Sequence, residues 1–172
     1  MDMKFMAIIE SINDVYFICI PESIDALLPS RGIVEVTGTI DEKPFNVVLE
    51  PDGMGCHFIL LNQKLYEAIH GDVGKTVHVE LVPIKIQSEV RVPDDLMEAL
   101  VKSACDILWN SLTVQARWEW VRWIRSTAVI ETRNKRIDTA ISMLRSGKKR
   151  PCCFDHSRCT LPEISKSGVL QI

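Results

Sequence analysis

The sequence predicts an α+β protein of two domains, in which a small, partly closed β-barrel with two short helices precedes a three-helix, bundle-like domain. Up to about residue 87 the chain shows short apolar runs and alternation, and after it apolar residues recur at helical spacing. Charge divides in a similar way: residues 1–100 carry 7 Lys and Arg against 17 Asp and Glu, whereas residues 101–172 carry 13 against 6. The expected segments are a barrel at 1–87, a helical domain at 88–150 and a Cys-containing tail at 151–172.

Five runs rich in β-branched and aromatic residues predict the strands of the barrel. They are VYFICI (15–20), IVEVTGTI (33–40), FNVVL (45–49), HFILL (57–61) and TVHVELV (76–82). The intervening DEKP and PDGMG have turn chemistry, because Pro presets φ and Gly tolerates positive φ.

Two short helices interrupt the strands and reveal a weak internal repeat. PESIDALL (21–28) starts with Pro and early acidic residues, and NQKLYEAIHG (62–71) opens with an Asn that can cap a helix and ends at Gly. Each helix lies between two strands, and the strand residues Phe17 and Phe58 are 41 positions apart. Such short units cannot bury their apolar faces alone, so we expect the two to close on each other into a barrel. An open α+β sheet is the alternative.

Three amphipathic segments predict the helical domain, with IQSEVRVP (86–93) as the linker. The first, at 92–112, begins with Pro93 and two Asp residues at the positive end of the helix dipole. The second, at 113–128, has Thr113 as its cap, and the third, at 131–147, stops at Gly147.

The N-terminus lacks the basic and apolar regions of a signal peptide, and no apolar run reaches the roughly 18–20 residues that span a bilayer. We therefore expect a cytoplasmic protein without a membrane span, in which the six cysteines are reduced.

Several motifs together resemble a known family. The helical part, with VPDDLMEAL, ARWEWVRWIRSTAVIETRNKRI and the following Leu-x-x-Gly, is similar to the YdeI/OmpD-associated (bacteriocin-protection, OmdA-type) family. GIVEVTGTIDEKPF and PDGMG are similar to the small β-barrel domain of unknown function that is often fused in front of it. The resemblance covers roughly residues 5 to 150. It implies an uncharacterised protein that acts by binding in a stress-response or bacteriocin-tolerance context, and it brings no catalytic mechanism, so an enzyme is the less favoured expectation.

Basic residues gather in the helical domain. Arg133 and Arg136 share a helix face beside Lys135, and the three could bind an anionic ligand or an acidic protein partner. A solvated face that pairs with the acidic barrel, or an ion-pair cluster with Glu131, is the structural alternative. A pI of about 5.8 and the lack of a recognised fingerprint disfavour nucleic acid, and neither the partner nor the oligomeric state follows from the sequence.

Two further motifs carry thiols or glycines. PDGMGCH lacks the spacing of a phosphate-binding loop, so a hairpin turn is the better interpretation, and Cys56 with His57 is not expected to form a nucleophile pair because neighbours on a strand point to opposite faces. The zinc-ligand types Cys152, Cys153, His156 and Cys159 lie close together, but adjacent cysteines suit one tetrahedral ion poorly. Thiol chemistry, promoted by nearby cations that lower a thiol pKa, and simple packing are the alternatives.

Overall fold

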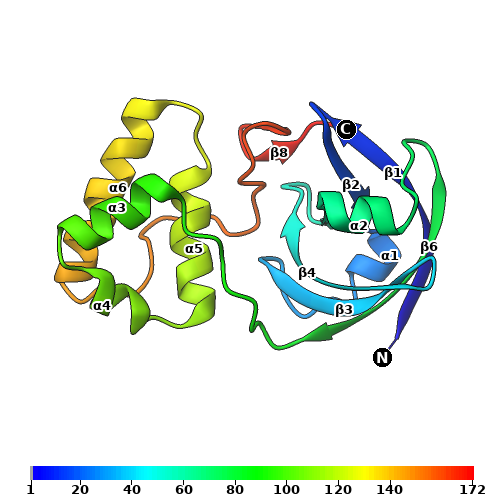
Figure 1. Cartoon of the computed structure of the whole chain (residues 1–172), viewed down its shortest axis with the longest axis horizontal. Helices are drawn as coiled ribbons and strands as arrows, with labels where there is room; N and C mark the ends of the chain where they lie inside the picture. The colour runs from blue at the N-terminus through cyan, green and yellow to red at the C-terminus, as the bar shows by residue number, and fades with distance from the viewer. Residues whose placement is uncertain (1) are drawn as a thin grey trace. The chain divides into compact units, whose positions relative to one another are not determined.

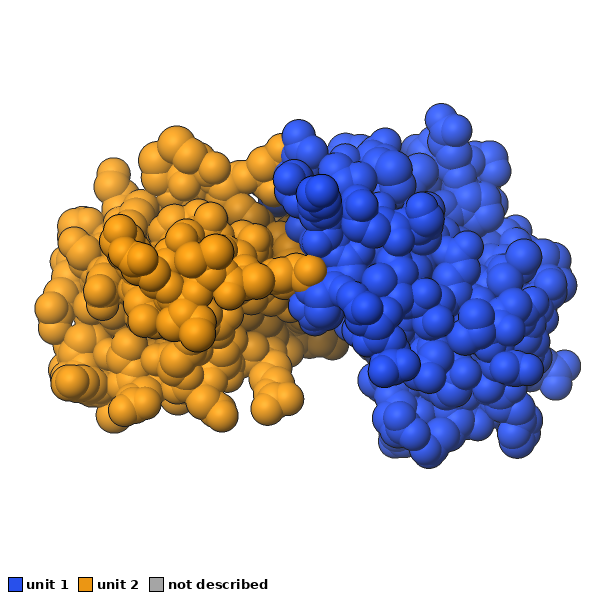
Figure 2. All heavy atoms as spheres, turned by 90° about the horizontal axis from the view of Figure 1, so that it is seen from above, with its two compact units in different colours: residues 1–86, 156–159, 163–172 blue, residues 87–155, 160–162 orange. Residues whose placement is uncertain are grey.

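A computed structural model, which describes residues 2–172, shows an α+β protein with a closed β-barrel followed by helices (Figure 1). The chain divides into two compact units, coloured separately in Figure 2. Unit 1 contains the residues up to Ile86 together with 156–159 and 163–172, and unit 2 contains 87–155 and 160–162. Unit 1 is therefore not one continuous stretch of chain.

Six antiparallel strands form the barrel of unit 1 in the order β1-β2-β5-β4-β3-β6. Their bounds are β1 (Met3–Ile12), β2 (Val15–Cys19), β3 (Val34–Ile40), β4 (Lys43–Pro51), β5 (His57–Leu61) and β6 (Thr76–Ile84). The expectation of only partial closure was wrong, because a sixth strand at residues 3–12, which the apolar runs did not indicate, completes the barrel. That strand, β1, pairs with β2 on one side and with β6 on the other.

The internal repeat explains how the barrel closes. Strands β1 and β2, helix α1 (Glu22–Asp25) and strand β3 form one half, and β4, β5, helix α2 (Gln63–Ala68) and β6 form the other. Equivalent strands pair across the halves, β2 with β5 and β3 with β6. The equivalent rings of Phe17 and Phe58 meet edge to face, with centroids 5.8 Å apart. Each half therefore covers the apolar strands that the other exposes.

The barrel interior is apolar and tightly packed. Ile9, Val36, Leu49, Ile59 and Val79 have no exposed surface, and they come from five different strands. The sequence alternation that predicted strands places these residues inside and their neighbours outside.

Unit 2 contains four helices, α3 (Asp94–Lys102), α4 (Asp106–Asn110), α5 (Val114–Arg125) and α6 (Ile130–Arg145). The expected single helix at 92–112 is split into α3 and α4, because the chain turns at Ala104, whose φ is +54°. Thr113 caps α5 as expected, since its side chain accepts a hydrogen bond from the backbone N–H of Ala116. No helix among residues 2–172 is long and apolar enough to cross a membrane.

The C-terminal residues of the structure return to unit 1. Strands β7 (Ser165–Lys166) and β8 (Val169–Leu170) form a hairpin. The Leu170 N–H donates to the Asp52 carbonyl at 2.8 Å, and the Asn13 side chain donates to the Glu163 carbonyl at 2.7 Å. The hairpin is thus hydrogen-bonded to the β4–β5 connection, and the chain just before it is hydrogen-bonded to the β1–β2 connection.

Candidate functional site

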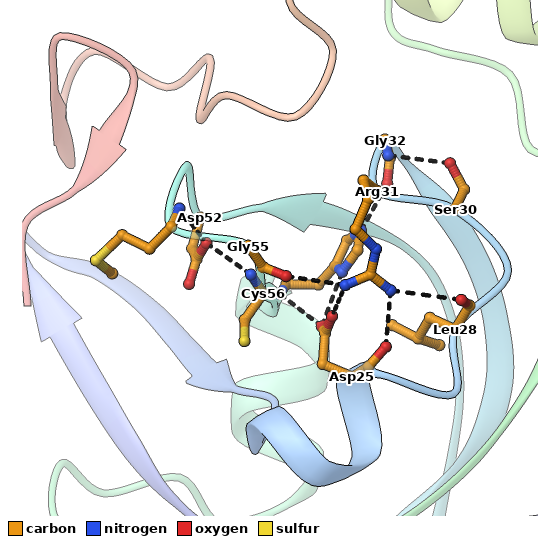
Figure 3. A network of polar contacts seen from close by, with 10 residues as sticks. Asp25, Leu28, Ser30, Arg31, Gly32, Asp52, Gly55 and Cys56 are labelled. Carbon is orange, nitrogen blue, oxygen red and sulfur yellow. Dashed lines mark hydrogen bonds and ion pairs between the residues drawn. The ribbon is translucent and has the colours of Figure 1, made fainter.

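A charged network lies beneath the connection between α1 and β3 in unit 1 (Figure 3). Asp25 is the last residue of α1, Arg31 follows in the connection, and His57 is the first residue of β5. Asp25 and His57 are each 1% exposed, whereas the side chain of Arg31 is 45% exposed. The network therefore joins two buried polar groups to one cation at the surface.

Asp25 is the centre of this network. Its Oδ1 accepts hydrogen bonds from the backbone N–H of His57 at 2.7 Å and from His57 Nδ1 at 2.8 Å. Its Oδ2 accepts a 2.5 Å hydrogen bond from Arg31 Nη1, which also donates to the Gly55 carbonyl at 2.8 Å. Arg31 therefore links α1 to the turn between β4 and β5, as Figure 3 shows.

The partners of His57 fix its protonation. Its Nε2 lies 2.6 Å from the Gly32 carbonyl oxygen, which can only accept, so Nε2 carries a proton. An ionised Asp25 requires that Nδ1 carry one as well. Burial by itself raises the pKa of Asp25, but the hydrogen bonds and positive charges of His57 and Arg31 outweigh burial and leave that pKa below its ordinary value. The arrangement is a buried carboxylate between two cations.

The turn beside this network is the one with the PDGMG sequence. Asp52 Oδ1 accepts from the backbone N–H groups of Met54 at 2.6 Å and Cys56 at 3.0 Å. Gly53 and Gly55 have φ of +82° and +106°, which other residues rarely adopt. The segment is a side-chain-stabilised hairpin turn, as the sequence analysis expected.

This network does not contain an activated nucleophile. Burial and the charges of Asp25 and Asp52 raise the pKa of the neighbouring Cys56 thiol, which is the opposite of what thiolate catalysis needs. Both ring nitrogens of His57 are already hydrogen-bonded. The three side chains act as a latch that holds the connection after α1 against β5. Sequence reasoning missed Asp25 and Arg31, because Asp25 and His57 are 32 positions apart and no motif joins them.

The structure uses two of the three predicted anion-binding residues inside unit 2. Arg133 donates to both carboxylate oxygens of Asp95, at 2.6 and 2.9 Å. Arg136 donates to the Trp123 carbonyl at 2.7 Å and lies over the Trp123 ring. Lys135 is exposed and pairs at 3.4 Å with Glu131, one turn away. Anion binding by these residues stays a prediction, and the geometry gives Arg133 and Arg136 a role in holding helices together.

The four predicted zinc ligands are divided between the two units. Cys152 and Cys153 are exposed residues of unit 2. His156 belongs to unit 1, where its side chain lies against Gly32, and Cys159 is buried in unit 1. Within residues 2–172, no group of three or more His, Cys, Asp or Glu side chains is arranged to hold a metal ion. The zinc site stays a prediction that this geometry does not support.

Two of the surface grooves are candidate binding sites. One, of about 370 Å³ in unit 1, is lined mainly by apolar residues of β1, the segment before β6 and the C-terminal residues of the structure. The other, of about 590 Å³ in unit 2, lies between α3 and α6 and is lined by Lys102, Asp138 and Arg145 among others. Arg145 donates to the Ser103 carbonyl at 2.8 Å, so this cation helps to close the end of α3.

Comparison with known protein families divides the chain at the same place as the structure does. Residues 5–81 match a domain of unknown function, DUF1905. Residues 89–147 match the family described as bacteriocin-protection, YdeI or OmpD-associated. No curated protein matches the chain at a significant level. The expected resemblance is therefore confirmed for both parts.

Proposed function

We propose that this protein, a DUF1905 domain followed by a YdeI/OmpD-associated domain, acts by binding cationic, amphipathic segments of proteins or peptides in the context of bacteriocin tolerance. The apolar groove of unit 1 is the observation that carries the proposal. The family description supplies the biological context, and the sequence-based expectation of a cytoplasmic protein is retained within the proposal.

The groove offers an apolar surface that water contacts. Ile8 and Val73 are each 51% exposed and Ile172 is 68% exposed, although all three are large hydrophobic residues. They lie beside the fully buried Phe17, which also lines the groove. Because the barrel is closed, β1 has neighbours on both sides, so a partner would be recognised by side chains and not by strand addition.

Charge favours a cationic partner. Glu10 lines the groove among the apolar residues. Residues 1–86 as a whole carry 6 Lys and Arg against 13 Asp and Glu. A segment with one basic face and one apolar face would therefore match both the apolar groove and the negative electrostatic potential of unit 1.

A synthetic amphipathic peptide of Leu and Lys tests the proposal by calorimetry or fluorescence anisotropy. Burying the exposed half of Ile8 is worth about 1 kcal/mol, so Ile8→Asp should weaken binding at least about fivefold. Glu10→Gln should weaken binding at low salt and have less effect at high salt, because screening removes the charge contribution. Ile107→Asp is the matched control, since Ile107 is a 77% exposed isoleucine of unit 2.

In cells, a strain that carries Ile8→Asp should lose tolerance to bacteriocin challenge, and one that carries Ile107→Asp should keep it. Equal peptide affinity of the wild type and both isoleucine variants would exclude the groove as the binding site. The sequence also suggested a thiol- or metal-dependent function at residues 152–159, and the proximity of Cys152 and Cys153 favours the thiol-dependent alternative.

A further inference from the structure

Two adjacent cysteines of unit 2 present both thiols to solvent. Cys152 and Cys153 are exposed, and their Sγ atoms lie 3.2 Å apart. In an extended chain neighbouring side chains point to opposite sides. Here the chain turns, and Cys153 has a φ of +58°, which brings both sulfur atoms to the same side.

Contacts with α5 hold the chain on both sides of this cysteine pair. They are the hydrogen bond from Trp120 Nε1 to the Lys149 carbonyl at 2.9 Å, the ion pair of Arg150 with Glu119 at 2.9 Å, and the placement of Arg122 over the Phe154 ring at 5.4 Å. Because the flanking residues are anchored on one helix, the proximity of the two thiols is a fixed property of the fold.

The other four cysteines are less suited to reaction. Cys105 and Cys159 are buried. Burial and the charge of Glu10 raise the pKa of Cys19 to about 12, and burial and nearby carboxylates raise that of Cys56. The cysteine pair differs from these sites, since both of its thiols are exposed.

The basic residues before the pair were expected to lower the thiol pKa values. For Cys153 the direction is the reverse, because a hydrogen bond to Cys152 and the charge of that neighbour raise its pKa. Two thiols that share one proton in this way ionise one after the other. This order suits a reaction in which one sulfur attacks first and the second follows.

We propose that Cys152 and Cys153 are a redox site that forms a reversible disulfide between adjacent residues by exchange with a small disulfide of the glutathione class. The first cysteine loses its proton to solvent and its thiolate attacks the small disulfide, which forms a mixed disulfide and releases one small thiolate. The second thiolate then attacks the protein sulfur of the mixed disulfide and releases the other. Two protein thiols are oxidised, and one small disulfide is reduced to two thiols, which take up the two protons.

The adjacency of the two residues makes the bond easy to reverse. Cα atoms across a trans peptide are about 3.8 Å apart, whereas disulfides usually join Cα atoms about 4.4–6.8 Å apart. A bond outside that range is strained, and strained, exposed disulfides are the labile and regulatory ones. The site therefore fits a switch better than a permanent crosslink. This redox function is separate from the groove of unit 1 and does not depend on peptide binding there.

Mass spectrometry of the full chain tests the proposal. The reduced protein is equilibrated with mixtures of reduced and oxidised glutathione, quenched with acid, alkylated and digested. As the oxidised share rises, the peptide that carries both cysteines should escape alkylation and have a mass two hydrogens below that of the free dithiol, and in excess reduced glutathione it should again be alkylated twice. Cys153→Ser should stop at the mixed disulfide, whose lifetime should exceed that in the wild type roughly tenfold or more, because the resolving thiol is gone. Cys56→Ser should behave as the wild type.

Phenylarsine oxide gives a second readout that needs both sulfur atoms. It bridges two neighbouring thiols with loss of one water, so it should protect both cysteines from alkylation in the wild type and neither in Cys152→Ser nor in Cys153→Ser. The proposal is overturned if the wild type accumulates only glutathione adducts at every ratio, or if the single variants retain the arsenical as the wild type does. Peptide binding by the groove is measured on the same samples, so failure of the redox proposal is distinct from failure of the binding proposal.

Discussion

Replacement of Asp25 by Asn tests whether the buried network is a latch that stabilises unit 1. The change keeps the shape of the side chain but removes the negative charge between His57 and Arg31. In the native protein Asp25 accepts two hydrogen bonds from His57 and one from the half-exposed Arg31. We expect Asp25→Asn to destabilise unit 1 strongly, since a cation would be left buried without its counter-charge.

The size of this effect follows from the geometry. Removing one partner of a buried ion pair costs about 3–5 kcal/mol, and the contribution of the solvent-screened Arg31 is less than about 1 kcal/mol. An Asn keeps an oxygen that can accept from the backbone N–H of His57, which keeps the total near the lower end, at about 3 kcal/mol. Since each 1.4 kcal/mol is about a factor of ten, the protection of β5 amides against hydrogen exchange should fall roughly a hundredfold.

Hydrogen exchange followed by mass spectrometry measures this loss strand by strand. All four tryptophans of the chain lie in unit 2, so the urea midpoint of tryptophan fluorescence reports on that unit and should not move. Asp14→Asn makes the same chemical change at an exposed turn residue of unit 1 and should alter stability by less than about 0.5 kcal/mol. If Asp25→Asn lowers the free energy of unfolding of unit 1 by less than about 1 kcal/mol, the network does not stabilise unit 1 as a latch.

The latch also predicts a dependence on pH. The pKa of Asp25 is lower in the folded protein than its ordinary value of 3.8, so the unfolded chain binds more protons in acid. The contribution of Asp25 to the stability of unit 1 is therefore complete at pH values above 3.8, and it is lost as the pH falls through the pKa that Asp25 has in the folded protein. The difference in the free energy of unfolding between the wild type and Asp25→Asn should therefore become smaller over the same pH range. If this difference stays constant as the pH falls, the charge of Asp25 is not its cause.

Two further predictions concern helix and strand packing. Arg133→Met should destabilise unit 2 by about 1 kcal/mol, because the half-exposed Asp95 loses a bidentate partner that lowers its pKa. Urea unfolding followed by tryptophan fluorescence measures this loss of stability, which should disappear in acid when Asp95 is protonated. If Arg133→Met destabilises unit 2 equally in acid, the ion pair with Asp95 is not the cause of the destabilisation. Gly38→Ala should greatly reduce the folded fraction measured by circular dichroism, because an added Cβ would lie 1.9 Å from the Glu80 carbonyl oxygen and β3 and β6 would have to separate. Normal folding of Gly38→Ala would show that the two strands can move apart.

Local sequence signals predicted most elements of the fold. Alternation identified five of the six barrel strands, and the capping residues Asn62 and Thr113 begin helices as expected. The strand β1 does not show clear alternation, because its exposed residues Met6 and Ile8 are as apolar as its buried residues. The break between α3 and α4 was missed because Ala104 favours helix by itself, and its positive φ arises from the turn around the buried Cys105.

The candidate sites were predicted less well, for a physical reason. Residue type and spacing left open whether Arg133 and Arg136 bind an anion, face solvent or form an ion-pair cluster with Glu131, and their contacts with Asp95 and the Trp123 carbonyl do not follow from that spacing. The partners Asp25 and His57 come from different halves of the barrel, and only the pairing of β2 with β5 brings the start of β5 close to α1. Contacts of this kind depend on tertiary structure and leave no periodic signal. The sulfur pair was visible as adjacent cysteines, but its 3.2 Å separation depends on the turn.

The pairing of equivalent strands across the two halves of the barrel has a consequence for how such a fold can arise. One half, taken alone, leaves its third strand without a neighbour and its first and second strands paired on one side only, and an identical copy related by a two-fold axis would supply the missing neighbours. The barrel thus contains, in one chain, the self-complementary interface of a symmetric homodimer. Duplication and fusion of a gene for one half is the simplest route to this arrangement. Once the halves are joined, each can change its sequence independently, and only the first carries the Asp25 carboxylate that receives His57 from the second.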